Sequence, residues 1–301
     1  MPIALVGHWV ARPGNRSLSS EASTPPPGCV SVIVTTRNSG KTLQACLSSV
    51  RQQTVADIEL IVVDNYSSDN TEEVGKRYAD RFLQAGPERS RQRNLGANLA
   101  SGDYLMFLDS DMVLQPTIVE ECLIQAQNGV GAVVIPETSI GSGYWATCKA
   151  LERSCYQGDD TIESPRFMDT GIFYELQGFD EDLTAGEDWD ISARIRGLGV
   201  SIARVKTPLW HDEGRLRLTE TMRAKFYYGR TIRRYMRKHP DLARGQLILF
   251  RPAFFRHMNR LARRPWITAG MILMKSSEMV AGGLGLLTTL RPDSVPKPSR
   301  L

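Results

Sequence analysis

The chain has 301 residues, of which 42% are hydrophobic, enough to bury one large core or two small ones. Its net charge of +4 is mildly basic, and arginine is concentrated between residues 215 and 264, a segment that would attract phosphate groups of any kind. The five cysteines are scattered without paired-ligand spacing, which argues against a disulfide framework and favours a reducing cytosol.

Residues 1–28 are predicted to form a disordered lead-in. The stretch Pro13–Gly28, PGNRSLSSEASTPPPG, is rich in proline and serine, and such a composition buries too little apolar surface to fold. No charged segment followed by an apolar one occurs here, so no secretory signal is expected.

From Val30 onward, short apolar runs alternate with segments of helical periodicity. The predicted strands are Val30–Thr36, Ile58–Asn65, Tyr104–Leu108 and Gly131–Glu137. Helices are predicted at residues 40–53, at 68–80 with Asp69 or Asn70 as N-cap, at 88–100, and from Pro116 onward. This alternation predicts an α/β sandwich with a mainly parallel sheet. After Gly141 the pattern becomes mixed, with longer irregular stretches.

Three of these strands end in polar residues, at Thr35–Asn38, Asp64–Asn65 and Asp109–Asp111. In parallel sheets, ligands bind beyond the carboxyl ends of the strands, so a nucleotide site is expected at this edge. An ionised carboxylate without a partner is costly to bury, so Asp109 and Asp111 must be solvated, paired or bound to a cation. Mg²⁺ or Mn²⁺ would suit them, with a substrate diphosphate completing the shell.

Two other nucleotide-binding motifs are not supported. Gly40-Lys41-Thr42 matches the tail of a P-loop, but Thr35 stands where that motif needs a glycine, so the loop could not wrap a phosphate closely. No predicted strand is followed by the G-x-G-x-x-G fingerprint of a dinucleotide fold.

A second acidic set, Glu187, Asp188 and Asp190, surrounds Trp189. It is either an acidic helix start favoured by the helix dipole, or a general base beside an indole that packs on a sugar. His211 closes a further apolar run and is a metal candidate only if its strand ends near Asp111. Otherwise a structural histidine is the simpler interpretation.

The ordered motifs between Val30 and Arg237 resemble the family 2 glycosyltransferases. They are Val30–Asn38, VVDN, ERSRQRNLGANLASGDYLMFLDSD, DTG, GFDE, GEDWD and the histidine. The resemblance implies a GT-A fold, which is a Rossmann-like, mixed but mainly parallel sheet flanked by helices, here with a C-terminal helical extension. It also implies a UDP- or GDP-sugar donor, Mn²⁺ or Mg²⁺, and inversion at the anomeric carbon.

The resemblance assigns roles by position. Donor-binding residues would be Thr35, Thr36, Asp64, Arg89, Arg93 and Asp109. Metal ligands would be Asp109, Asp111 and His211. Asp188 would be the catalytic base, and Trp189 and Glu187 would contact the acceptor. Many relatives carry two adjacent acids where this chain has Asp64-Asn65, which leaves the preferred nucleotide base open.

Three parts are expected along the chain: the lead-in 1–28, a catalytic domain 29–238, and a basic and apolar extension 239–301. Residues 266–287 are about as long as a membrane span of roughly 20 residues, but Lys275 and Glu278 interrupt them one turn apart, where they can pair. The segment either docks on the catalytic domain or contacts a membrane peripherally. We favour the second, at the cytoplasmic face of the cell membrane, with a sugar or lipid-linked acceptor.

Rival functions are a GT-A-like domain that binds a nucleotide sugar or lipid phosphate without catalysis, a nucleic-acid-binding protein, and a nucleotidyltransferase. The first is disfavoured because the chain keeps the two strand-end acids, Asp109 and Asp111, and also keeps Asp188 and His211. No aromatic-basic recognition motif supports nucleic-acid binding. The missing glycine-rich first loop disfavours the third.

Overall fold

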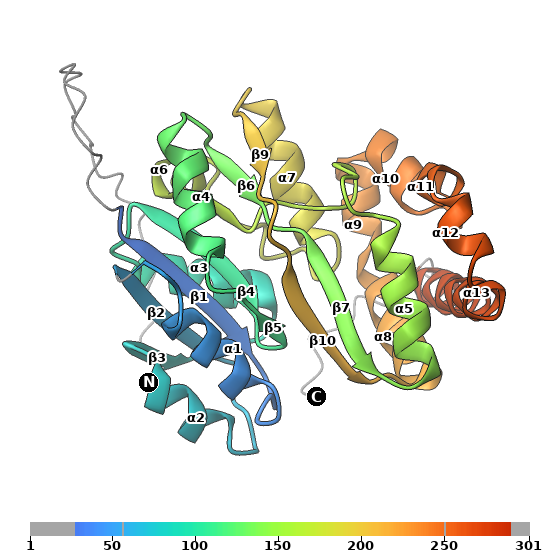
Figure 1. Cartoon of the computed structure of the whole chain (residues 1–301), viewed down its shortest axis with the longest axis horizontal. Helices are drawn as coiled ribbons and strands as arrows, with labels where there is room; N and C mark the ends of the chain where they lie inside the picture. Colours follow the sequence, from blue (N-terminus) through green and yellow to red (C-terminus); the bar gives the residue numbers. More distant parts are fainter. Residues whose placement is uncertain (1–27, 56, 250, 290–301) are drawn as a thin grey trace.

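The computed structural model describes residues 28–55, 57–249 and 251–289. Nearly all of the predicted lead-in lies outside these residues. The described chain forms a central sheet with helices on both faces, a smaller second sheet beside it, and a cluster of helices at one end (Figure 1).

Within the described residues the central sheet has the strand order β3-β2-β1-β4-β8-β6-β9. Its strands are β1 (Val30–Thr36), β2 (Ile58–Asp64), β3 (Arg81–Gln84), β4 (Tyr104–Asp109), β6 (Ala132–Val134), β8 (Phe167–Asp169) and β9 (Ile202–Arg204). All neighbours pair in parallel except β8, which is antiparallel to both β4 and β6. The predicted α/β fold with a mainly parallel sheet is therefore confirmed.

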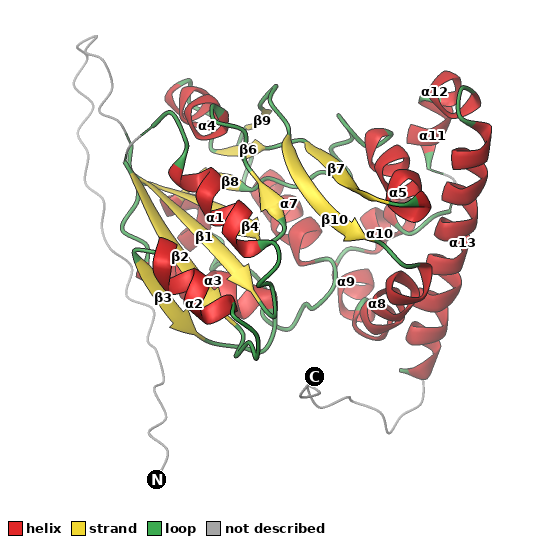
Figure 2. Ribbon diagram, turned by 60° about the horizontal axis from the view of Figure 1, so that its bottom comes forward, coloured by secondary structure: helices red, strands yellow, loops and turns green. Residues whose placement is uncertain are grey.

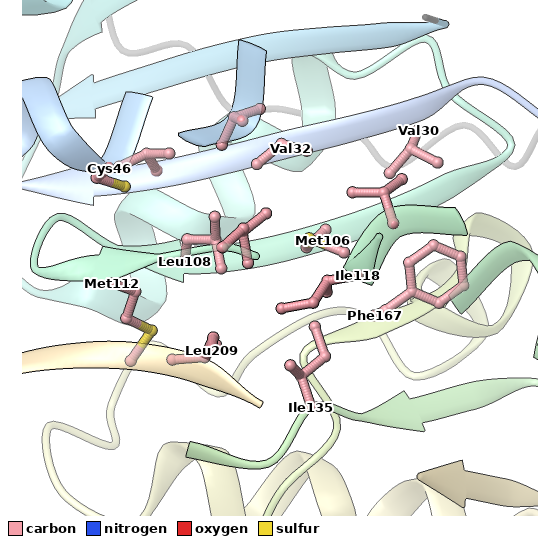
Figure 3. Close-up of a cluster of buried hydrophobic side chains, with 14 of the residues drawn as sticks. Val30, Val32, Cys46, Met106, Leu108, Met112, Ile118, Ile135, Phe167 and Leu209 are labelled. Atoms are coloured by element: carbon pink, nitrogen blue, oxygen red, sulfur yellow. The ribbon is translucent and has the colours of Figure 1, made fainter. Parts of the chain in front are cut away.

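The apolar strands are buried on both faces, because alternate side chains point to opposite sides of the sheet. Val30, Val32 and Val34 of β1 join one core cluster, whereas Ile33 joins the other. Figure 3 shows part of the first cluster, where Met106 of β4 gathers with side chains of neighbouring helices and strands. Each fully buried aliphatic side chain contributes roughly 1.5–3 kcal/mol to folding.

Two sets of helices cover the two faces. The first set is α1 (Leu43–Arg51), α2 (Thr71–Tyr78) and α4 (Ile118–Gln127); the second is α3 (Arg89–Leu99), α6 (Thr170–Glu175) and α7 (Glu187–Gly197). Helices α3 and α7 matter most for the site, since their N-terminal turns carry the charged motifs found in the sequence.

The second sheet has the order β5-β10-β7 within the described residues, with β5 (Met112–Val113), β10 (Leu209–Arg215) and β7 (Glu137–Ser142). His211 lies opposite Met112, and the backbone amide of Asp212 donates to the carbonyl of Asp111 at 2.8 Å. This pairing brings a segment 100 positions downstream against the end of β4.

The helical cluster comprises α5 (Tyr144–Ser154), α8 (Leu218–Thr231), α9 (Arg233–Lys238), α10 (Pro240–Gln246), α11 (Pro252–Arg256), α12 (Met258–Ala262) and α13 (Pro265–Thr288). Helix α13 packs along α8 and α5 (Figure 2). Glycines permit the close contact: a Cβ added at Gly229 would lie 2.1 Å from the carbonyl oxygen of Gly282. In the described part of the chain, no helix combines the length and apolarity needed to cross a membrane.

Several predicted boundaries are wrong. The helix expected from Pro116 begins at Ile118. The single strand expected over Gly131–Glu137 is divided between β6 and β7, which lie in different sheets, and Pro136, which lacks an N–H, stands at the break. Strand β10 continues past the apolar run to Arg215, so His211 lies inside it. Strand β3 was missed, since only two of its four residues are apolar.

Candidate active site

The polar carboxyl ends of β1, β2 and β4 lie side by side, as the sequence predicts for a parallel sheet. Thr35 is in register with Asp109, and Thr36 is in register with Asp64. Asp64 is fully buried and accepts a 2.9 Å hydrogen bond from the amide of Ser67. The hydroxyl of Thr36 is buried and has no hydrogen-bond partner among the described residues.

Asp109 lies within reach of three guanidinium groups. Nearest is Nη2 of Arg93 at 3.0 Å, followed by Arg89 at 3.8 Å and Arg166 at 3.9 Å. Thr35 also donates a long 3.5 Å hydrogen bond to Oδ1. Burial alone would raise the pKa of Asp109, but the positive charges of Arg93, Arg89 and Arg166 outweigh it and hold the pKa below its ordinary value. Asp109 is therefore an anion that the protein itself already neutralises.

Arg93 is fully buried and joins two of the predicted site residues. Its Nη1 donates to Oδ1 of Asp188 at 2.6 Å, while its Nη2 contacts Asp109. The guanidinium also stacks 5.0 Å from the ring of Phe179, and its Nε has no hydrogen-bond partner among the described residues. Because Arg89 precedes it by one helical turn, both arginines face the same side of α3.

The first turn of α7 divides the second acidic set. Glu187 is buried and pairs with Arg89 at 3.0 Å, and burial together with the charge of Asp188 raises the pKa of Glu187. The side chain of Asp188 is 38% exposed, so it is accessible to a substrate. Asp190 is fully buried on another side of the helix, where it contacts Lys238 at 2.7 Å and His239 at 2.8 Å. These contacts indicate that Asp190 stabilises the fold rather than contacting a substrate.

Trp189 is held by the body of the protein. Its indole Nε1 donates to the carbonyl of Ile162 at 3.1 Å, and its ring packs 5.7 Å from the ring of Tyr235. The indole also lines the same cavity as Asp188.

Asp111 and His211 lie together, which meets the condition set by the sequence. Nε2 of His211 is 3.4 Å from Oδ2 of Asp111, and its Nδ1 is 3.0 Å from Glu137. Burial lowers the pKa of His211, but its hydrogen bonds to Asp111 and Glu137 prevail and raise it to about 9. Oδ1 of Asp111 is buried without a hydrogen-bond partner in the described chain. No group of three or more candidate ligands gathers there among the described residues.

Sequence reasoning missed the charged network beside this pair. Glu137 forms an ion pair with Arg166 at 2.5 Å and another with Arg153. Arg153 in turn contacts Glu213 at 3.2 Å. The positive charges of Arg166 and Arg153 overcome the effect of burial and hold the pKa of Glu137 well below its ordinary value. The position of Glu137 directly after the apolar run AVVIP was a signal of a functional or paired charge. Its partner arginines, however, could be assigned only from the assembled sheet.

A cavity of about 670 Å³ opens beside these groups. The predicted residues that line it are Arg89, Arg93, Asp109, Glu187, Asp188, Trp189 and His211. Thr35, Thr36, Asp64 and Asp111 lie outside its lining, toward the strand ends. Its far wall comes from α8 and α13, and Tyr228 of α8 places its ring 5.9 Å from the Arg89 guanidinium. The C-terminal helices therefore help to form the site.

Residues 31–178 match the family model described as Glycosyl transferase family 2. The chain is 33% identical over 103 residues to the uncharacterized glycosyltransferase YibD of Escherichia coli, covering 32% of this chain and 30% of YibD. Across the first four curated relatives that match, the chain spans between 30% and 60% of their length.

Two solved structures share the fold. The mannosyltransferase PcManGT from Pyrobaculum calidifontis, in complex with GDP-Man and Mn²⁺, has a TM-score of 0.60 at 16% identity and covers 86% of this chain and 87% of its own. TarS 1–349 of S. aureus, in complex with UDP-GlcNAc, has a TM-score of 0.54 at 18% identity and covers 84% and 81%. The fold is thus that of the GT-A glycosyltransferases. Within residues 31–178, just under half of the chain, the sequence is that of a family 2 glycosyltransferase.

Proposed function

We propose that the protein transfers a sugar from a UDP- or GDP-sugar to an acceptor hydroxyl, with inversion, and that Asp188 is the general base. The observation that carries this proposal is the convergence of Asp188 and Asp109 on one cavity, beside strand ends suited to a nucleoside. GDP-Man in PcManGT and UDP-GlcNAc in TarS support a nucleotide-sugar donor.

The nucleoside would lie at the ends of β1 and β2. There the buried Thr36 hydroxyl lacks a partner among the described residues, and the Asp64 carboxylate can accept hydrogen bonds from a base. The diphosphate would lie nearer β4, within reach of Arg89, whose side chain is 39% exposed. Arg93 is fully buried, so its role in donor binding would be to fix Asp109.

Transfer requires removal of the acceptor's hydroxyl proton. As the acceptor oxygen bonds to the anomeric carbon, its proton passes to the free oxygen of Asp188, and the bond from that carbon to the diphosphate oxygen breaks. Attack from the face opposite the leaving group inverts the configuration. The 2.6 Å hydrogen bond from Arg93 would hold the Asp188 carboxylate in position during approach.

The residues present fit a divalent cation, Mn²⁺ or Mg²⁺. Asp111 offers a buried carboxylate oxygen without a hydrogen-bond partner in the described chain, and the His211 ring nitrogen is adjacent. Such ions commonly take one or two protein carboxylates and complete their shell with water and substrate phosphates. When bound, the cation would offset negative charge on the leaving diphosphate. Asp109, surrounded by arginines, would support this site rather than dominate it.

The outer surface of α13 suits a peripheral membrane contact. Trp266, Leu273, Val280 and Leu287 recur every seven residues, and their exposed fractions are 82%, 56%, 60% and 59%. A seven-residue spacing places them along one stripe of a helix. The arginines at 256, 260, 263 and 264 lie just before the stripe in the chain, where they would attract anionic lipid head groups at the cytoplasmic face of a membrane.

The test is a screen of UDP- and GDP-sugars with the full chain, with Mn²⁺, Mg²⁺ or neither. Binding is measured by calorimetry, and donor hydrolysis by nucleotide release. Saturable binding of one nucleotide sugar together with its slow hydrolysis supports the proposal. Binding without hydrolysis or transfer would indicate a binding protein, and no binding at all would refute a nucleotide-sugar function.

A further inference from the structure

The end of the cavity between α5, α8 and α13 carries an unusual concentration of charge. Four basic side chains and two acidic ones line it: Lys149, Lys225, Arg251, Lys275, Glu152 and Glu278. In Figures 1 and 2 these helices lie at the opposite end of the molecule from β2 and β3, near which the nucleoside would bind. Whatever these charges recognise is therefore separate from the nucleotide end.

Both acids are already paired. Glu152 accepts hydrogen bonds from Lys275 at 2.6 Å and from Lys149 at 3.0 Å, and Glu278 is 3.3 Å from Lys149. Glu152 and Glu278 are 1% and 3% exposed, so this is a buried network. Two lysines and two carboxylates thus form ion pairs, as buried charges require, while Oε2 of Glu278 lies 3.7 Å from Lys275 and has no hydrogen-bond partner among the described residues.

Lys225 is the excess charge. It projects from α8 into the same cavity, and it makes no ion pair with the described residues. Burial, together with the charge of nearby Lys149, lowers the pKa of Lys225 to about 8. Arg251 adds a second cation: its guanidinium lies over the ring of Tyr156 at 5.0 Å, and its buried Nε lacks a hydrogen-bond partner among the described residues.

We infer that this end of the cavity binds an oxyanion, phosphate or carboxylate, carried by the acceptor, and that Lys225 is its principal contact. The inference rests on the proposed function, because Asp188 on the same cavity defines where the acceptor hydroxyl must lie. An acceptor spanning from Asp188 toward α8 and α13 would place its anionic group among excess positive charge. A neutral sugar would leave that charge without a partner.

The experiment measures binding to the full chain at fixed ionic strength by calorimetry. The probes are inorganic phosphate, glycerol 3-phosphate, glucose 6-phosphate and glucuronate, with glycerol and glucose as neutral counterparts. Lys225→Met removes the charge and keeps the length of the side chain, Lys225→Arg restores a cation, and Lys206→Met changes an exposed lysine elsewhere. Binding of UDP and GDP and the thermal midpoint are measured for every variant.

We expect at least one organic oxyanion to bind the wild type and Lys206→Met about 10–100-fold more tightly than its neutral counterpart, the effect of one charge-assisted hydrogen bond. Lys225→Met should lose that preference, Lys225→Arg should regain most of it, and nucleotide affinity should stay unchanged in both variants.

Other outcomes overturn the inference. Equal binding of charged and neutral probes, or an unchanged preference in Lys225→Met, would show that the cluster is structural. Inorganic phosphate that binds as tightly as both phosphate esters would identify a free-ion site, and weaker UDP or GDP binding in Lys225→Met would assign the cluster to the donor. If the wild type bound neither UDP nor GDP, the proposed function itself would fail, independently of the lysine result.

Discussion

Arg93 donates a 2.6 Å hydrogen bond to Asp188 from a guanidinium group that is fully buried. The other terminal nitrogen of the same group lies 3.0 Å from Asp109 at the end of β4. One rigid cation therefore links the residue proposed to take the acceptor's proton with the strand end proposed to face the donor. A shift of Arg93 toward or away from one of these two carboxylates would therefore change the electrostatic environment of the other carboxylate.

The first prediction concerns Asp188. Asp188→Asn removes the proton acceptor while keeping the shape of the side chain, so transfer should fall about 10²–10⁴-fold, equivalent to roughly 3–5 kcal/mol. Nucleotide affinity should remain within about threefold. Steady-state transfer and calorimetric UDP or GDP binding provide the two measurements. Asp182→Asn, at a carboxylate that is 69% exposed, is the matched control. Near wild-type transfer in Asp188→Asn would exclude it as the base.

The second prediction concerns Arg93 itself. Arg93→Met leaves the buried Asp109 and the partly exposed Asp188 without their shared cation, and breaking a buried ion pair costs up to about 3–5 kcal/mol. Denaturant unfolding followed by circular dichroism should show that loss. Arg91→Met, at an exposed position of the same helix, should change stability by no more than about 0.5 kcal/mol. Equal effects from the two substitutions would show that the buried bridge contributes nothing specific.

A third prediction separates the cation site from the nucleotide site. Asp111→Ala should abolish the increase in nucleotide affinity that Mn²⁺ or Mg²⁺ produces, while metal-free nucleotide binding persists, because its carboxylate lies outside the cavity and beside His211. Calorimetry in the presence and absence of chelator is the measurement. Asp241→Ala, at a carboxylate that is 93% exposed, should respond like the wild type. Metal-independent affinity in the wild type would contradict the cation assignment.

A fourth prediction follows from the lowered pKa of Lys225. Its pKa is about 8 in the folded protein and 10.5 when unperturbed, so the folded state disfavours the charged form. The charged groups that influence it are Lys149, Lys275, Glu152 and Glu278. This penalty is fully present below pH 8 and disappears as the pH rises toward 10.5. At pH 7, Lys225→Met should raise the free energy of unfolding by about 1–3 kcal/mol.

The predicted stabilisation by Lys225→Met is checked by its dependence on pH. Denaturant unfolding of the wild type and Lys225→Met at intervals from pH 6.5 to 10.5 should show two curves that converge above about pH 10. A difference that stays constant across this range would assign the gain to apolar packing of methionine rather than to removal of the charge.

How far the sequence predicted this molecule depends on how locally each feature is encoded. Strands such as Val30–Thr36 carry their own β-branched signal, and the parallel sheet then brings Thr36 beside Asp64 without further information. The Glu137 and Lys149 networks are different. Arg166 is 29 positions from Glu137, and Glu278 is 129 positions from Lys149. Such pairs leave no pattern in either segment, so the second sheet and the lysine end of the cavity emerged only from the folded chain.

Residues 266–287 show both a locally encoded feature and one that depends on contacts between distant segments. Its helical nature and the Lys275–Glu278 pair are confirmed, the two side chains lying 3.7 Å apart in α13. The sequence left docking and membrane contact as alternatives. The structure shows docking on α8 and α5 through one side of α13, while the stripe containing Trp266, Leu273 and Val280 is exposed on the outside. The two interpretations therefore concern different faces of one helix.

The last prediction tests the outer face without disturbing the inner one. Removing α13 would break the buried network of Glu152 and Lys275, so deletion cannot separate membrane contact from folding. The combined change Leu273→Ser, Val280→Ser and Leu287→Ser keeps that network. It should weaken flotation with vesicles of anionic lipid at least about tenfold, since each change removes an aliphatic group able to insert. Nucleotide binding should be unaffected.

The matched control is Leu99→Ser, Ile124→Ser and Leu198→Ser, three exposed aliphatic residues outside α13, with 39%, 47% and 43% exposure. It should float like the wild type. Vesicles of neutral lipid should bind the wild type more weakly than anionic ones, because the arginines before α13 contribute only where head groups carry negative charge. If the wild type fails to float with anionic vesicles, or if both triple variants float equally well, the outer face of α13 is not a membrane contact.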